Sequence, residues 1–135
     1  MGQNGGDITA SYSTGSVTAT GSDIGGLVGN HNLKTIKKSY STSSVNGGDN
    51  AGGLVGFAND NIENSFATGA VSGSSQVGGL VGNLDSGIIT NSFSTGTVSG
   101  STNIGGFVGL KSGFGAAQNS FWDTDESGTT ICFFF

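Results

Sequence analysis

The chain has 135 residues, of which 10% are charged, and a formal net charge of −5 with only four lysines or arginines. It therefore lacks the basic face that neutralises phosphates, which argues against nucleic-acid binding. The single cysteine, Cys132, excludes an internal disulfide, and no paired cysteine and histidine spacing is typical of a zinc site.

The first element to recur along the chain is a block of about ten residues with a central aromatic residue. Its copies read ITASYSTGSV from Ile8, IKKSYSTSSV from Ile36, IENSFATGAV from Ile62, ITNSFSTGTV from Ile89 and, in degenerate form, AAQNSFWDT from Ala116. The aromatic residues are spaced by 28, 26, 27 and 28 residues. A fixed period of this size predicts a repeat architecture.

A glycine-rich pentapeptide follows each of the first four blocks. It reads GGLVG at 25–29, 52–56 and 78–82, and GGFVG at 105–109. Nearly the whole chain is thus one unit repeated four to five times. We expect a single domain over residues 1–135, with repeats over about 8–128 and an atypical tail or cap over 129–135.

Within a unit, the aromatic block reads as a short strand. Ile62, Asn64 and Phe66 share one parity, so a strand would turn this apolar-rich side inward. Gly69 ends the run and Val71 starts a shorter one. No stretch has a helical apolar period with caps, and the chain has 27 glycines and no proline. Three short strands per unit are expected.

The pentapeptide is harder to interpret, because Leu54 and Val55 are adjacent and cannot both point inward in a regular strand. Either the glycine pair forms a bulge that resets the register, or this strand is covered on both faces. The pattern leaves both alternatives open.

These observations predict an all-β fold, a right-handed parallel β-solenoid (β-helix) of four to five coils of about 27 residues. The handedness follows from the general preference for right-handed parallel crossovers. Equivalent residues of successive coils would then stack about 4.8 Å apart. The expected core contains an aromatic ladder (Tyr12, Tyr40, Phe66, Phe93 and Phe121) and a valine ladder (Val17, Val45, Val71 and Val98). Asn64, Asn91 and Asn119 are expected to form a partial ladder of stacked amides.

The same parity predicts an outward face made of small hydroxyl side chains. Its candidate binding residues are Ser11, Ser13, Ser39, Ser41, Ser65, Ser92, Ser94, Ser120 and Trp122. The layout is similar to the ordered hydroxyl arrays of ice-binding solenoids, although Ala67 and Trp122 interrupt it. Trp122 would be the one exposed aromatic side chain able to stack on a sugar. The simpler interpretation is a plain polar β-face.

Catalytic and metal chemistry is poorly supported by the sequence. His31, the only histidine, is expected to be a solvated residue of the turn Asn30–Asn32, and no hydrolase motif lies near it. The string from Asp123 to Gly128 matches half of a calcium loop, but Phe134 stands where a bidentate glutamate is needed. We therefore expect neither enzymatic activity nor a cofactor or metal, and read Asp123–Gly128 as an acidic turn.

No apolar run is long enough to span a bilayer, and the start of the chain shows no signal peptide. If the parent protein is exported, this chain would be an internal piece of it.

Taken together, the repeats resemble the GLUG repeat, a glycine-rich motif of large bacterial and archaeal surface proteins. The resemblance is carried by IGGLVGN at Ile24, AGGLVGF at Ala51, VGGLVGN at Val77 and IGGFVGL at Ile104, and by NSFWDTDESG from Asn119. The family includes adhesin-like proteins and the non-catalytic part of some IgA-cleaving metallopeptidases. It implies a surface-exposed solenoid spacer or adhesive segment and brings no catalytic residues. The ending TTICFFF departs from the pattern, and would be either a cap or the product of a truncated frame.

The expected function is that of a non-enzymatic structural or adhesive repeat segment of a cell-surface or secreted protein. The alternatives are a ligand-binding module for carbohydrate or ice, using the serine face, and the non-catalytic repeat region of a larger surface peptidase. Expected partners are a host surface or a polysaccharide, and a second copy of the chain through open strand edges at residues 8–17.

Overall fold

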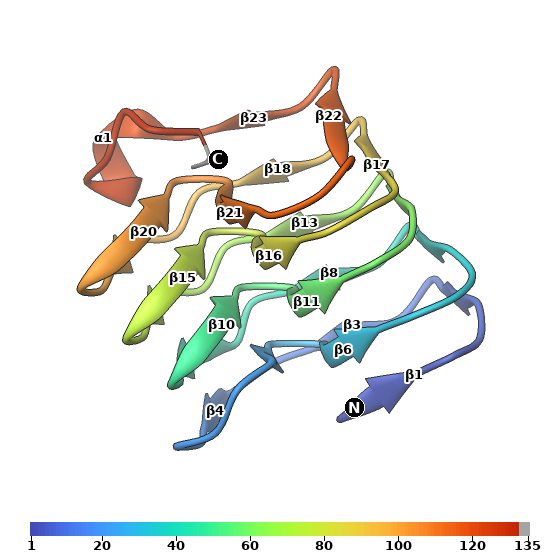
Figure 1. The fold of residues 1–135 in the computed structure, drawn as a ribbon, viewed down its shortest axis with the longest axis horizontal. Helices are drawn as coiled ribbons and strands as arrows, with labels where there is room; N and C mark the ends of the chain where they lie inside the picture. The colour runs from blue at the N-terminus through green and yellow to red at the C-terminus, as the bar shows by residue number, and fades with distance from the viewer. Residues whose placement is uncertain (133–135) are drawn as a thin grey trace.

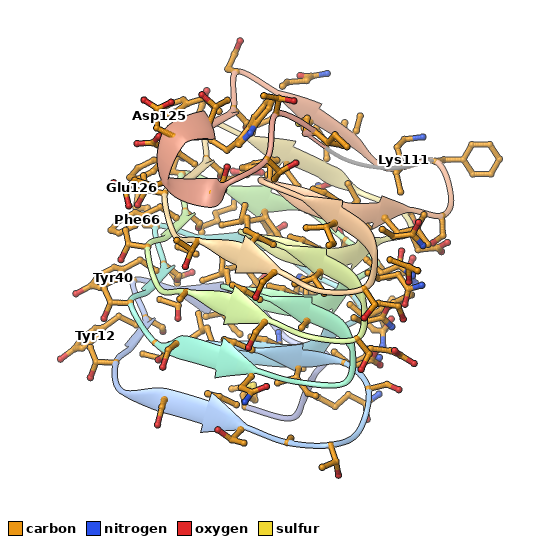
Figure 2. The ribbon with its side chains drawn as sticks, turned by 90° about the vertical axis from the view of Figure 1, so that its left-hand side faces the viewer. Tyr12, Tyr40, Phe66, Lys111, Asp125 and Glu126 are labelled. Atoms are coloured by element: carbon orange, nitrogen blue, oxygen red, sulfur yellow. The ribbon has the colours of Figure 1, made fainter. Side chains whose placement is uncertain are left out.

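The structure is a computed structural model that describes residues 1–132. It is a parallel β-solenoid of about four turns, whose coils stack from the N-terminal coil to the C-terminal coil (Figure 1). The two views together show a right-handed winding (Figures 1 and 2). The all-β fold predicted from the repeats is confirmed. The three terminal phenylalanines lie outside the described residues. They belong to the predicted cap, and they include Phe134, the twelfth position of the calcium-loop match.

Each complete coil contributes one strand to each of five parallel sheets, so a unit has five strands rather than the three predicted. The first sheet contains β1 (Gln3–Asn4), β6 (Val28–His31), β11 (Val55–Ala58), β16 (Val81–Leu84) and β21 (Val108–Lys111). The second contains β5 (Ile24–Gly25), β10 (Asp49–Gly52), β15 (Ser75–Gly78) and β20 (Thr102–Gly105). These two sheets meet at the pentapeptide.

The aromatic block supplies the other three sheets. One contains β2 (Ile8–Thr9), β7 (Ile36–Lys37), β12 (Ile62–Glu63), β17 (Ile88–Thr90) and β22 (Ala116–Gln118). The next contains β3 (Tyr12–Ser13), β8 (Tyr40–Ser41), β13 (Phe66–Ala67), β18 (Phe93–Ser94) and β23 (Phe121–Trp122). The last contains β4 (Ser16–Thr18), β9 (Ser44–Asn46), β14 (Val71–Ser72) and β19 (Val98–Ser99). A short helix, α1 (Thr124–Ser127), follows β23.

Equivalent residues of successive repeats pair in register. Phe66 pairs with Tyr40 and Phe93, and Val71 pairs with Val45 and Val98. The core is therefore a set of ladders. Val45 and Val71 are buried, and Val17 and Val98 pack against them, so the valine ladder is confirmed as core.

A bend at the pentapeptide explains why two adjacent apolar residues are both buried. Strand β10 ends at Gly52 and β11 begins at Val55, while Leu54 lies at the bend between them. The carbonyl of Leu80, one coil later, accepts hydrogen bonds from the N–H groups of both Leu54 (2.9 Å) and Val55 (3.1 Å). The register is thus reset at the bend, as in the first of the two alternatives, and both side chains point into the core.

A second corner reverses the orientation predicted for the aromatic block. Asn64 has a φ of 50°, in the left-handed region, and so it separates β12 from β13 instead of continuing the strand. Because this residue resets the alternation, Ile62 remains inside while Phe66 turns outward. The prediction that the aromatic residues point into the core is wrong for this reason.

The asparagine column has a backbone role rather than the predicted amide ladder. Asn64, Asn91 and Asn119 are exposed, and all have φ near 50°. Ala10 and Lys38, at the same position in the first two coils, adopt φ of 50° and 51°. Asparagine is enriched there because it tolerates the left-handed conformation better than most residues.

Candidate functional site

The predicted serine face is mostly interior. Ser39, Ser41, Ser65, Ser92 and Ser94 are all buried, at no more than 1% exposed. The remaining serines of the set, Ser11, Ser13 and Ser120, are half-buried. The prediction of an exposed hydroxyl array is therefore wrong, and the reset at the left-handed corner is again the reason.

The first serine column forms a hydrogen-bonded ladder along the solenoid axis. The N–H of Ser39 donates to Oγ of Ser65 (3.2 Å), and the N–H of Ser65 donates to Oγ of Ser92 (3.2 Å). Each hydroxyl in turn donates to a carbonyl two residues earlier, as Ser65 does to Glu63 (2.8 Å). Ser11 and Ser120 extend the ladder at its two ends. These serines satisfy the backbone at a corner where regular strand pairing is interrupted.

The second column consists of Ser13, Ser41, Ala67 and Ser94. Its side chains are small because they face the glycine pairs of the pentapeptides across the interior. A Cβ added to Gly53 would lie 2.8 Å from the Cβ of Ala67, and one added to Gly79 would lie 2.9 Å from Oγ of Ser94. Neither distance is tolerated, so glycine is required on one side and a small residue on the other. The column is thus explained by packing.

Trp122 occupies the same column in the last repeat and lies over Gly106. Its ring packs against the core, and Nε1 donates to the carbonyl of Thr129 (3.2 Å). The prediction that Trp122 is an exposed sugar-stacking residue is wrong. The structure instead places it at the C-terminal end of the core.

Residues 129–132 occupy the position of a further coil. The carbonyl of Cys132 accepts from the N–H groups of Phe107 (3.3 Å) and Val108 (2.9 Å), as the carbonyl of Leu54 accepts from Leu27 and Val28. The described part of the predicted cap therefore pairs with the edge of the last complete coil. Burial raises the pKa of the Cys132 thiol to about 11.

The acidic turn from Asp123 is a helix cap. Its carboxylate accepts from the N–H groups of Asp125 (3.0 Å) and Glu126 (3.1 Å), and Gly128 ends the helix with a φ of 72°. The string predicted to be an acidic turn thus forms a capped helix of one turn, which the sequence analysis did not predict.

His31 is fully buried, so its prediction as a solvated turn residue is wrong. It lies on β6 at the position that Ala58 and Leu84 occupy in later coils. Removal from water lowers the pKa of His31, against the opposing effects of the nearby backbone of Lys34 and Asn61 and of two carboxylates.

The aromatic ladder, which the sequence analysis placed in the core, is exposed. Successive ring centroids from Tyr12 to Phe121 are 5.2, 4.8, 4.8 and 5.3 Å apart, and the ring planes are within 10° of parallel. Tyr12 is 64% exposed, and the side chains of Tyr12, Tyr40 and Phe66 project outward along one edge of the solenoid (Figure 2). Because the rings cover each other's faces, the ladder presents mainly ring edges.

A column of threonines runs beside the aromatic ladder, each directly after the end of the strand that carries the aromatic residue. It consists of Thr14, Thr42, Thr68 and Thr95, of which the first three are exposed. The N–H of each threonine after the first donates to a carbonyl of the previous coil. A sequence signal for this face was present, since in three coils an asparagine, which tolerates the left-handed conformation, stands two residues before the aromatic residue. Parity alone pointed to the other side.

Among residues 1–132 we find no group of three or more histidine, cysteine, aspartate or glutamate side chains arranged to hold a metal ion. The helical part of the described chain includes no segment that is long and apolar enough to span a membrane.

Comparison with known proteins identifies the repeat. Residues 47–72 and 73–99 each match a family model described as the GLUG motif, and each match covers one coil, β10 to β14 and β15 to β19. The resemblance inferred from the sequence is therefore confirmed. Searches of curated proteins and of solved structures found no match.

Proposed function

We propose that this chain, a GLUG-motif repeat protein, acts as a non-enzymatic structural and adhesive segment of a cell-surface or secreted protein. The observation that carries the proposal is the continuity of the ladders. Each sheet pairs a strand only with the equivalent strands of neighbouring coils, so a coil can be added without changing the others. Such a segment extends by a fixed step for each repeat.

The spacer function can be tested by lengthening the array. Three extra copies of residues 73–99, inserted after Ser99, should lengthen the particle by about 14 Å in small-angle X-ray scattering. The strand content per residue should stay constant in circular dichroism. An insert of the same composition in scrambled order is the control. An increase in length far from about 14 Å, or a strand content per residue as low as that of the control, would contradict the spacer function.

The adhesive part of the proposal is favoured by the aromatic ladder and its threonine column. Together they form an uncharged ridge, which offers apolar ring edges beside hydroxyl groups and consists of Tyr12, Tyr40, Phe66 and Phe93 with Thr14, Thr42, Thr68 and Thr95. A polysaccharide or a host surface is the proposed ligand. Replacing Tyr40 and Phe66 by serine should abolish retention on a glycan array, whereas Ser74→Ala with Ser101→Ala, in exposed turns, should not. Equal retention of both variants would contradict this role.

Surface exposure and self-association complete the proposal. Protease treatment of intact cells that express the parent protein should release peptides of this chain. Analytical ultracentrifugation should detect association of copies through strand edges such as those of residues 8–17. A catalytic domain encoded beside this segment would instead favour the repeat region of a surface peptidase.

A further inference from the structure

One buried polar contact joins the N-terminal strand to the rest of the solenoid. Nδ2 of Asn4, on β1, lies 3.2 Å from Nδ1 of His31, on β6. His31 is 0% exposed and Asn4 is 9% exposed, so water does not compete strongly for this contact. At the equivalent positions, later coils have Ala58 and Leu84. The polar pair is thus special to the junction of β1 and β6.

The orientation of the Asn4 amide is fixed by Gly6. Oδ1 of Asn4 accepts from the N–H of Gly6 (3.1 Å), and Nδ2 donates to the Gly6 carbonyl (2.5 Å). Nδ2 therefore presents an N–H group to the histidine, and Nδ1 of His31 must accept it as an unprotonated nitrogen. The ring hydrogen then lies on Nε2, which has no hydrogen-bond partner among the described residues.

A proton added to His31 would have to be placed on Nδ1, directly against the amide of Asn4. Two N–H groups would then face each other, and the charged ring would be buried with an unpartnered Nε2. The carboxylates of Asp7 and Asp60 and the backbone of Lys34 and Asn61 favour the imidazolium, yet burial outweighs them. Asp7 and Asp60 are themselves engaged by the N–H groups of Thr35 (3.0 Å) and Lys34 (2.9 Å).

We propose that the Asn4–His31 contact is a pH-sensitive latch, and that protonation of His31 releases residues 1–7 from the edge of β6 while the later coils stay folded. The released edge would be the backbone that now pairs with this segment. Its N–H groups at Gly29 and Asn30 donate to the carbonyls of Met1 and Gly2 (both 2.7 Å), and that of Asn32 donates to Asn4 (2.9 Å). Few bonds beyond these hold the segment.

The backbone amides of Gly29, Asn30 and Asn32 report directly on whether residues 1–7 remain paired with β6. Hydrogen–deuterium exchange of the full chain, corrected for intrinsic rates, is followed by NMR from about pH 7.5 to about pH 5. Protection of Gly29, Asn30 and Asn32 should fall by up to about tenfold for each pH unit below about pH 6.5, the ordinary histidine pKa that His31 regains once the segment is released. Protection should persist at Asn59, whose N–H donates to the carbonyl of His31, and at Leu80, whose N–H donates to Phe107.

His31→Leu is the matched variant, because leucine already occupies the equivalent position 84. Asn4 keeps its bonds to Gly6 in this variant, so residues 1–7 should stay paired and the amides of Gly29, Asn30 and Asn32 should stay protected over the whole pH range. If the variant does not fold, the wild-type histidine ring resonances give a second readout. The ring resonances and the amide resonances of Gly29, Asn30 and Asn32 should titrate with the same midpoint. Unchanged protection through that midpoint, or a simultaneous loss at Leu80, would overturn the latch.

Discussion

The backbone N–H of Ser65 donates to Oγ of Ser92, one coil further along the solenoid, over 3.2 Å. Both residues are 1% exposed, and the Ser92 hydroxyl also donates to the carbonyl of Thr90 (2.9 Å). A single hydroxyl thus completes the backbone hydrogen bonding of two successive coils at one corner. The serine of the NSF motif is therefore a structural requirement of the winding.

Replacing Ser92 by alanine should destabilise the protein by about 1–3 kcal/mol, because the buried N–H of Ser65 would lose its acceptor. The Thr90 carbonyl would keep only its bond from the N–H of Asn64. Ser99→Ala, at an exposed serine of the same coil, should change the free energy of unfolding by less than about 0.5 kcal/mol. Urea unfolding followed by circular dichroism measures both. Equal effects of the two substitutions would show that the ladder contributes nothing.

Gly79→Ala should be more damaging than its one added methyl group implies. The added Cβ would lie 2.9 Å from Oγ of Ser94 and would overlap the backbone of Gly106 in the next coil, where little can move. Overpacking of this kind costs about 3 kcal/mol. Gly21→Ala is the control, since nothing lies within 4 Å of its added Cβ. Thermal unfolding should separate the two variants clearly, and similar melting temperatures would contradict the tight packing.

The repeat period predicted correctly which residues pair, whereas the inside–outside alternation of strand residues did not predict correctly which side chains are buried. The period placed Phe66 beside Phe93 and Val71 beside Val98, because parallel coils of equal length pair equivalent residues. Alternation failed across Asn64, since a single left-handed residue exchanges inside and outside without changing the apolar pattern. The serine columns were therefore assigned to the surface, although they belong to the interior.

His31 was misplaced for a different reason. Its neighbours Asn30 and Asn32 are typical of a turn, but by pairing it is equivalent to the buried Ala58. Alignment of the coils on the pentapeptide would have placed it in an interior column. Its partner Asn4 lies 27 residues earlier, one repeat period away, so the period also pairs these two residues, although the segment around Asn4 does not resemble the repeat.

Lys38→Asn should stabilise the protein. Lys38 has a φ of 51° at the corner where three later coils have asparagine, and the left-handed conformation costs most side chains about 1–2 kcal/mol. We expect a gain of about 1 kcal/mol in the free energy of unfolding. Thr42→Asn, exposed in the same coil and without a positive φ, should give none. A gain in both variants would point to a general effect of composition rather than to the backbone.

Cys132 should react slowly in the folded protein. Folding raises the pKa of its thiol from 9.0 to about 11, so at about pH 8 the thiolate, which is the reactive form, is about a hundredfold rarer than in the unfolded chain. Alkylation by iodoacetamide, followed by mass spectrometry, should accelerate by about this factor when the protein is unfolded in urea. Glutathione in the same two solutions corrects for the effect of urea on the reagent. A folded-state rate equal to the unfolded rate would mean that residues 129–132 do not stay paired with Phe107 and Val108. In that case the edge of the last complete coil would be open to another strand.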